Sequence, residues 1–221
     1  MSTYDKKSLI HYGVLGMKWG HRKPKIGSLT DSFTIKKGSN IYRTTSNKDE
    51  GLSGHAFTTV DKKDALGYMY RGSMFNNTSF NMEFKVTKDI VTPSKKTRVD
   101  TFIKLLDNDP EFRKALSSSI ATYKVYSSPE AIEKKLSKLK TAEAKSREYN
   151  QSLALGVAGN KKVRDKYFES LAKQGYNAMV DDADATIVSR MPLIIFDKQK
   201  TLEVISVNKI NRKYIKDFKK E

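Results

Sequence analysis

Strand-forming segments lie towards both ends of this sequence, and helix-forming segments fill its middle. Residues 79–86 alternate apolar and polar side chains with a period of two, the pattern of a strand with one buried face. The continuous apolar run 193–196 indicates a central strand buried on both faces. The full set of expected strands is Phe33–Ile35, Ile41–Thr45, His55–Val60, Ser79–Val86, Asp89–Thr92, Tyr176–Asp181, Pro192–Asp197 and Leu202–Val207. This order predicts an α+β fold with a mixed β core and a helical insertion.

Capping residues mark where the expected helices begin. Asp61 is placed to cap a helix that contains Ala65, Tyr68 and Met69. In the middle of the chain, Asp109 precedes a proline that suits the first helical position, and the pattern Ser127-x-x-Glu130 resembles a capping box. The last expected helix runs from the cap Asn160 to about Gln174, with Gly175 just beyond its end. The segment Ser152–Asn160 is apolar but contains glycines, and we expect a loop there.

The chain is strongly basic, with a formal net charge of +17 over 221 residues. Charge of this size attracts polyanions such as nucleic acid, acidic membranes or acidic protein surfaces, although it can also serve solubility alone. The sequence contains no recognisable helix-turn-helix, zinc-finger or RNA-binding signature. We therefore expect non-specific proximity to nucleic acid rather than recognition of a base sequence.

The residue types present exclude several kinds of site. The sequence has no cysteine, which rules out disulfides, thiolate zinc sites and cysteine nucleophiles. Its three histidines are scattered, and we expect no metal site. No stretch approaches the roughly 18–20 apolar residues that a membrane-spanning helix requires, so a soluble chain without a membrane partner is expected.

Residues 1–30 differ in composition from the rest of the chain. Glycines spaced three or four apart oppose a stable helix, and large apolar side chains stand between them. The candidate anchors are Tyr12, Leu15, Met17 and Trp19. This pattern predicts an extended segment that docks on another protein through residues 8–22, followed by a basic linker. A strap over the chain's own domain is the alternative. Residues 208–221 form a basic C-terminal tail.

The run His11-Tyr-Gly-Val-Leu-Gly-Met-Lys-Trp-Gly-His-Arg22 resembles a short segment that recurs in structural and morphogenesis proteins of tailed phages infecting Gram-positive bacteria. The resemblance covers about a dozen residues and implies a virion context. Together with the basic charge, it suggests a protein held inside the capsid, near the packaged DNA and bound to the major capsid protein. Ejection with the DNA would carry such a protein into the host cytoplasm.

A second resemblance covers most of residues 40–207 and concerns the mono-ADP-ribosyltransferase family. The stretches that carry it are Ile41-Tyr-Arg-Thr-Thr45, Gly54-His-Ala-Phe-Thr-Thr59, Asp64-Ala-x-x-Tyr68, Gly175-Tyr-Asn-Ala-Met-Val-Asp-Asp182 and Pro192-Leu-Ile-Ile-Phe-Asp197. It implies a transferase-like domain over residues 31–207 that uses NAD as its substrate.

The family pattern also implies roles for individual residues. Arg43 would contact the phosphate or ribose of NAD, since its planar fork matches phosphate oxygens. Thr58 and Thr59 would orient catalytic groups by hydroxyl hydrogen bonds. Tyr68 would stack or pack beneath the pocket, and His55 would stack on the nicotinamide. Taken without the family, Arg43 is equally a salt-bridging strand residue, and the threonine pair simply favours a strand.

The sequence departs from the family at the catalytic carboxylate. Transferases of this kind use a Glu just before the strand expected at 192–196, where it stabilises the cation formed at the ribose as nicotinamide leaves. Here that position reads Ser189-Arg-Met-Pro192. Three aspartates lie nearby, Asp181, Asp182 and Asp184. Without the family resemblance, these three residues indicate only a turn between two strands. Either one of them substitutes, with Asp182 the first candidate, or catalysis is lost.

Three functions fit this sequence. The first is a virion protein that ADP-ribosylates host proteins after ejection. The second is an inactive transferase-fold scaffold that lines the capsid and contacts packaged DNA. The third is an inhibitor of a host defence system.

Overall fold

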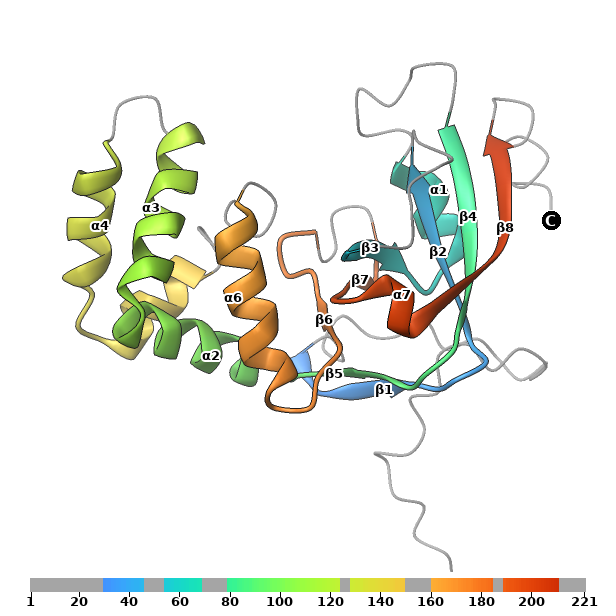
Figure 1. Ribbon diagram of the computed structural model, residues 1–221, viewed down its shortest axis with the longest axis horizontal. Helices are drawn as coiled ribbons and strands as arrows, with labels where there is room; N and C mark the ends of the chain where they lie inside the picture. Colours follow the sequence, from blue (N-terminus) through green and yellow to red (C-terminus); the bar gives the residue numbers. More distant parts are fainter. Residues whose placement is uncertain are drawn as a thin grey trace, which may run out of the picture. The chain divides into compact units, whose positions relative to one another are not determined.

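The computed structural model describes residues 30–45, 54–68, 79–123, 128–149, 160–184 and 189–210 (Figure 1). The expected docking anchors in 1–30, the loop before residue 160 and the tail beyond Ile210 lie outside these residues. The described chain divides into two compact units. Unit 1 holds the residues up to Thr92 and those from Asn177 onwards, whereas unit 2 runs from Pro93 to Tyr176.

Unit 1 is built on a six-stranded sheet with the order β6-β7-β3-β2-β4-β8. Its strands are β2 (Asn40–Thr45), β3 (Ala56–Thr59), β4 (Ser79–Val86), β6 (Ala178–Val180), β7 (Pro192–Ile195) and β8 (Leu202–Ile210). The strands that follow the helical middle pair with those that precede it, because β7 lies beside β3 and β8 beside β4. The α+β class expected from the sequence is confirmed.

Every pairing among the described strands is antiparallel. The expectation of a mixed β core is wrong in this respect. Side-chain periodicity identifies which residues form strands, but the direction of neighbouring strands depends on the connections between them. The strand β8 also continues to Ile210, three residues beyond the expected end.

A second, two-stranded sheet joins β1 (Phe33–Ile35) to β5 (Ile90–Thr92). The Asn177 side chain ties β5 to the chain that enters β6. Its Oδ1 accepts the Val91 N–H at 2.7 Å, and its Nδ2 donates to the Asp89 carbonyl at 2.8 Å. The helical middle therefore leaves and rejoins unit 1 at adjacent points of the backbone.

The core of unit 1 lies on the apolar faces of these strands. All four residues of β7 are buried, as expected for a strand flanked on both sides by β6 and β3. The largest fully buried side chains of this unit are Ile35, Ile41, Phe84 and Ile90. Two short helices complete the unit, α1 (Lys62–Gly67) and α7 (Lys198–Thr201). Asp61 caps α1 as expected, because its side chain accepts the Lys63 N–H at 2.7 Å.

Unit 2 is helical in the part of it that the structure describes. It comprises α2 (Lys95–Asn108), α3 (Pro110–Tyr123), α4 (Pro129–Ser137), a segment at 142–149 and α6 (Lys161–Ala172). Asn160 caps α6 as expected, and Gly175 beyond its end has a φ of 92°. The cap of α4 is Ser128, whose side chain accepts the Ala131 N–H at 3.2 Å. The expected cap was one residue too early, since Pro129 takes the first helical position that its fixed φ favours.

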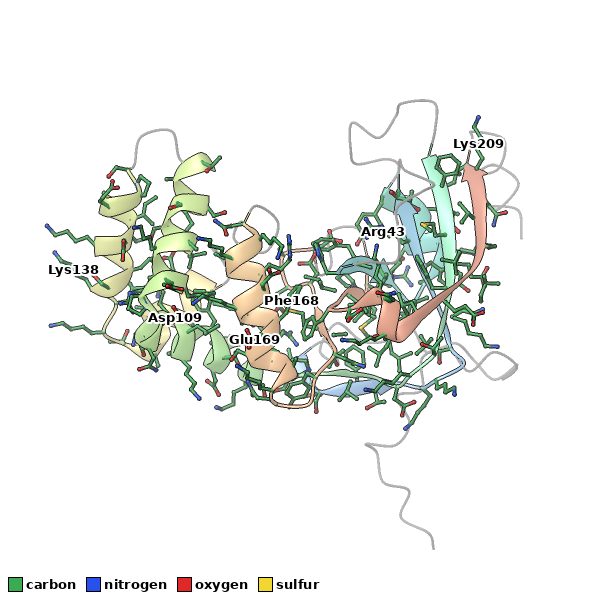
Figure 2. The ribbon with its side chains drawn as sticks, viewed as in Figure 1. Arg43, Asp109, Lys138, Phe168, Glu169 and Lys209 are labelled. Atoms are coloured by element: carbon green, nitrogen blue, oxygen red, sulfur yellow. The ribbon has the colours of Figure 1, made fainter. Side chains whose placement is uncertain are left out.

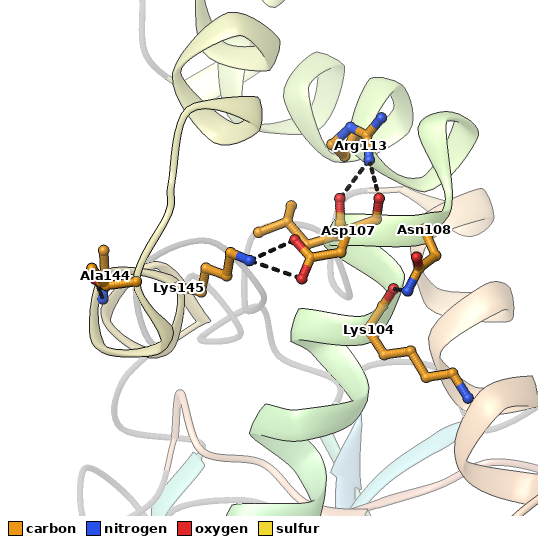
Figure 3. Close-up of polar contacts among 8 residues, drawn as sticks. Lys104, Asp107, Asn108, Arg113, Ala144 and Lys145 are labelled. Atoms are coloured by element: carbon orange, nitrogen blue, oxygen red, sulfur yellow. Dashed lines mark hydrogen bonds and ion pairs between the residues drawn. The ribbon is translucent and has the colours of Figure 1, made fainter.

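The end of α2 is fastened by side chains from the following segments (Figure 3). Arg113 donates from Nη1 to the carbonyl oxygens of Leu106 and Asp107, at 2.6 and 3.1 Å. Lys145 pairs with the Asp107 carboxylate at 2.7 Å. Carbonyl groups in the last helical turn lack helical partners, and cations there also interact favourably with the helix dipole. These contacts stabilise unit 2 without involving unit 1.

Candidate functional site

A pocket of about 280 Å³ opens on unit 1 where β2, β3 and the start of β7 lie side by side. Its walls also include the end of α1 and the turn that follows β6. The lining residues are Tyr42, Arg43, Thr44, Phe57, Thr58, Tyr68, Asp181, Asp184, Pro192 and Leu193. Segments more than a hundred residues apart in sequence thus meet at one site.

Arg43 lies on β2 (Figure 2), opposite Met82 of β4. Its side chain is half-buried and lines the pocket. Its neighbour Tyr42 stands opposite Thr59 of β3 and also lines the pocket. The pocket lining therefore includes both a planar cation and an aromatic ring. Such a pair suits a ligand that carries phosphate and a ring system.

Thr58 and Thr59 occupy different environments although they are adjacent on β3. Thr58 lines the pocket and is only 4% exposed, and its buried Oγ1 has no hydrogen-bond partner among the residues that the structure describes. A buried hydroxyl without a partner costs about 1–3 kcal/mol. A polar atom of a bound ligand would satisfy this hydroxyl.

Thr59 is fully buried and takes no part in lining the pocket. Its Oγ1 lies 2.7 Å from the Oγ of Ser189, which in turn lies 3.3 Å from the Asp64 carboxylate. The backbone N–H of Arg190 donates to the same carboxylate at 2.7 Å. This network attaches the chain just before β7 to β3 and α1. The Thr59 hydroxyl therefore contributes to the fold at this point and does not face the pocket.

His55 is half-buried and is not among the pocket-lining residues. It packs edge-to-face on Phe57, with ring centroids 5.4 Å apart. Phe57 itself lines the pocket and is 36% exposed, which is unusual for a large apolar ring on an inner strand. Sequence reasoning missed Phe57. In the sequence, Phe57 lies between His55 and Thr58, which were both predicted site residues. Its aromatic type at that place is the only feature that could have identified it.

Tyr68 is the C-cap residue of α1, and its hydroxyl donates a hydrogen bond to the Asp184 carboxylate. Burial raises the pKa of Tyr68, and the Asp184 carboxylate raises it further. The phenol therefore stays protonated over the physiological range and remains a hydrogen-bond donor. Tyr68 and Asp184 link α1 to the turn after β6 across the pocket.

The three aspartates after β6 are not equivalent. Asp181 and Asp184 line the pocket, whereas Asp182, half-buried, is not among the lining residues. The Asp184 N–H donates to the Asp181 carbonyl at 3.1 Å, which makes residues 181–184 a tight turn. The first and last residues of this turn, Asp181 and Asp184, are the ones that line the pocket. The sequence candidate Asp182 occupies a middle position instead.

Burial raises the pKa of Asp181 to about 6, and the charges of Asp184 and Asp182 add to the effect. The Ala183 N–H donates to Asp181 Oδ1 at 3.1 Å and acts in the opposite direction. The pocket thus holds one carboxyl that titrates just below neutral pH and a second that accepts from a tyrosine. Two carboxyls in unlike environments can take different roles in one reaction.

Two further classes of site receive no support from the described part of the chain. It contains no group of three or more His, Cys, Asp or Glu side chains able to hold a metal ion. None of its helices has the length and apolar character needed to cross a membrane.

Asp181→Asn is expected to stabilise the protein at pH 7.5. The folded-state pKa of about 6 lies above the ordinary value of 3.8, so ionisation of this carboxyl costs stability above pH 6. Allowing for its partial exposure, the gain is about 1–2 kcal/mol, and it disappears as the pH falls from 6 towards 4. Denaturant unfolding of both proteins across this range measures it. Equal stabilities at pH 7.5 would show that the carboxyl is not desolvated.

Among families of known proteins, one described as a family of unknown function (DUF7211) matches residues 2–25. No curated protein and no solved structure matches the chain.

Proposed function

We propose that unit 1 is an ADP-ribosyltransferase-like domain that binds NAD in this pocket, within an internal capsid protein of a tailed phage. Ejected with the DNA, the protein transfers ADP-ribose from NAD to host proteins. One observation carries the enzymatic part of this proposal. Arg43, Thr58 and Tyr68, three of the five residues to which the family pattern gives a role, share one pocket with two carboxylates.

The pocket residues fit the nicotinamide half of NAD. A volume of about 280 Å³ lies just below the range of about 300–1,000 Å³ typical of small-molecule sites, so the pocket accommodates part of a dinucleotide. Arg43 supplies a planar cation for the diphosphate, and the Thr58 hydroxyl supplies a buried polar group for the ribose or the carboxamide. Tyr42 and Phe57 supply apolar ring surface.

The chemistry required is cleavage of the bond between the ribose and nicotinamide. The sugar becomes cationic as nicotinamide leaves, and an anion near it lowers the barrier. The pocket carboxylates supply that anion, and the helical unit 2 is not needed for this step.

The N-terminal segment supplies the virion part of the proposal. The family match over residues 2–25 spans the expected docking segment 8–22, which marks it as a unit of sequence in its own right. The anchors Tyr12, Leu15, Met17 and Trp19 bind the major capsid protein from inside. The net charge of +17 attracts the rest of the chain to the packaged DNA.

A second candidate function is an inactive transferase-fold scaffold between capsid and DNA. A specific observation favours it: the position before β7 holds Ser189, which is buried and bonded to Thr59 rather than open to the pocket. Exposed lysines such as Lys138 and Lys209 extend from the surface and are free to approach phosphates (Figure 2).

Arg43→Ala is expected to weaken NAD binding about tenfold to hundredfold, the loss typical of a hydrogen-bonded charge pair. Label transfer from NAD to proteins of a host lysate should disappear with it. Calorimetry and gel autoradiography measure the two effects, and Arg147→Ala, at an exposed site outside unit 1, is the matched control. Absence of NAD binding by the unaltered chain, together with DNA binding that falls steeply with salt, would support the scaffold instead.

Deletion of residues 1–25 is expected to abolish packaging into virions while both units stay folded, because the capsid anchors lie in this segment. Quantitative immunoblotting of purified particles measures the copy number, and circular dichroism of the purified variant checks the fold. A truncated protein packaged at the normal copy number would contradict the docking role.

A further inference from the structure

We propose that Asp184 is the catalytic carboxylate of this pocket and that Tyr68 is the residue that positions it. This inference rests on the proposed function, since it assigns a residue to the bond cleavage described above. The family pattern points to the stretch before β7, which lacks an acid. The structure offers an acid from a different segment of the chain.

The turn after β6 reaches the place where the family's Glu would stand. β6 and β7 are antiparallel neighbours, with Val180 opposite Leu193. The Asp181 N–H donates to the Pro192 carbonyl at 3.0 Å, which fixes the start of the turn beside the start of β7. In an antiparallel pair, the end of one strand meets the beginning of its neighbour. A carboxylate on this turn therefore substitutes in space for one that precedes β7.

Asp184 is the best suited of the three aspartates. It lines the pocket, whereas Asp182 does not, and it accepts a hydrogen bond from Tyr68 across the pocket. The Tyr68 hydroxyl, which donates to this carboxylate, fixes its orientation in the pocket. Asp181 is the more suitable proton acceptor, because its pKa of about 6 lies close to neutral pH.

An observation independent of the acids marks the same place as a ligand site. The Thr58 hydroxyl lines the pocket and is buried, and no described residue hydrogen-bonds to it. Thr58 lies on β3 and pairs with Leu193 of the neighbouring strand β7. Asp181 and Asp184 line the same pocket, so a polar ligand atom that satisfies this hydroxyl would share the pocket with both carboxylates.

The reaction then balances with residues of this chain and water. The bond between the ribose carbon and the nicotinamide ring nitrogen breaks, and its electron pair stays on the nitrogen, so nicotinamide leaves neutral. The ionised Asp184 stabilises the cationic ribose carbon. Water or an acceptor side chain attacks that carbon and forms the new bond, and its proton passes to the Asp181 carboxylate. With water, the products are ADP-ribose, nicotinamide and a proton.

The test measures nicotinamide release and NAD affinity separately, on the full chain. Asp184→Asn should lower kcat about a hundredfold or more, the loss typical of removing one electrostatic stabiliser, while the Kd for NAD changes less than about threefold. Tyr68→Phe should lower kcat about tenfold with KM little changed, as expected when a positioned carboxylate loses one hydrogen bond. Asp100→Asn, on the exposed face of α2, is the matched control.

Each outcome decides the assignment. Release by Asp184→Asn at more than a third of the normal rate would overturn it and leave the proposed function intact. Loss of release in Asp182→Asn alone would transfer the role to Asp182. An unaltered chain that binds NAD without releasing nicotinamide would show that no carboxylate here is catalytic, and one that binds no NAD would overturn the proposed function as well. Asp184→Ser serves as a second neutral variant if Asp184→Asn fails to fold.

Discussion

The antiparallel pairing of β3 with β7 is the contact on which the rest of unit 1 depends. It joins Ala56–Thr59 to Pro192–Ile195, segments separated in sequence by β4, β5 and the whole of unit 2. Such long-range pairing carries a cost in chain entropy, which grows only slowly with the length of the enclosed loop. Burial of all four β7 side chains offsets it, at roughly 1.5–3 kcal/mol for each large apolar one. Without this pairing, the pocket would lose the wall that Pro192 and Leu193 form beside β3.

The sequence predicted those features that depend on local patterns. The strand at 79–86 has the expected limits, because an alternation of eight residues leaves little room for another register. The caps Asp61 and Asn160 were predictable for the same reason, since a cap acts on amides two or three residues away. Ser127 was the wrong choice beside Ser128, because two adjacent serines offer the same chemistry and only the position of Pro129 separates them.

The composition of the pocket depends on geometry that residue types do not encode. Thr58 and Thr59 are identical in sequence terms, yet one faces the pocket and the other bonds to Ser189. The sequence favoured Asp182 among the three aspartates, whereas the turn places Asp181 and Asp184 at the pocket. Phe57 was not predicted as a site residue, because the exposure of its ring depends on the neighbouring strands and not on its own sequence context. Long-range contacts also set the strand directions, which the sequence did not reveal.

The most direct test of NAD binding in this pocket is a titration of the ¹⁵N-labelled full chain with NAD, followed through its backbone amide signals. We expect saturable shifts concentrated at Arg43, Thr58, Tyr68 and Asp184, with the amides of unit 2 little changed. Shifts confined to unit 2, or none at NAD concentrations well above the millimolar range, would contradict the claim that this pocket binds NAD.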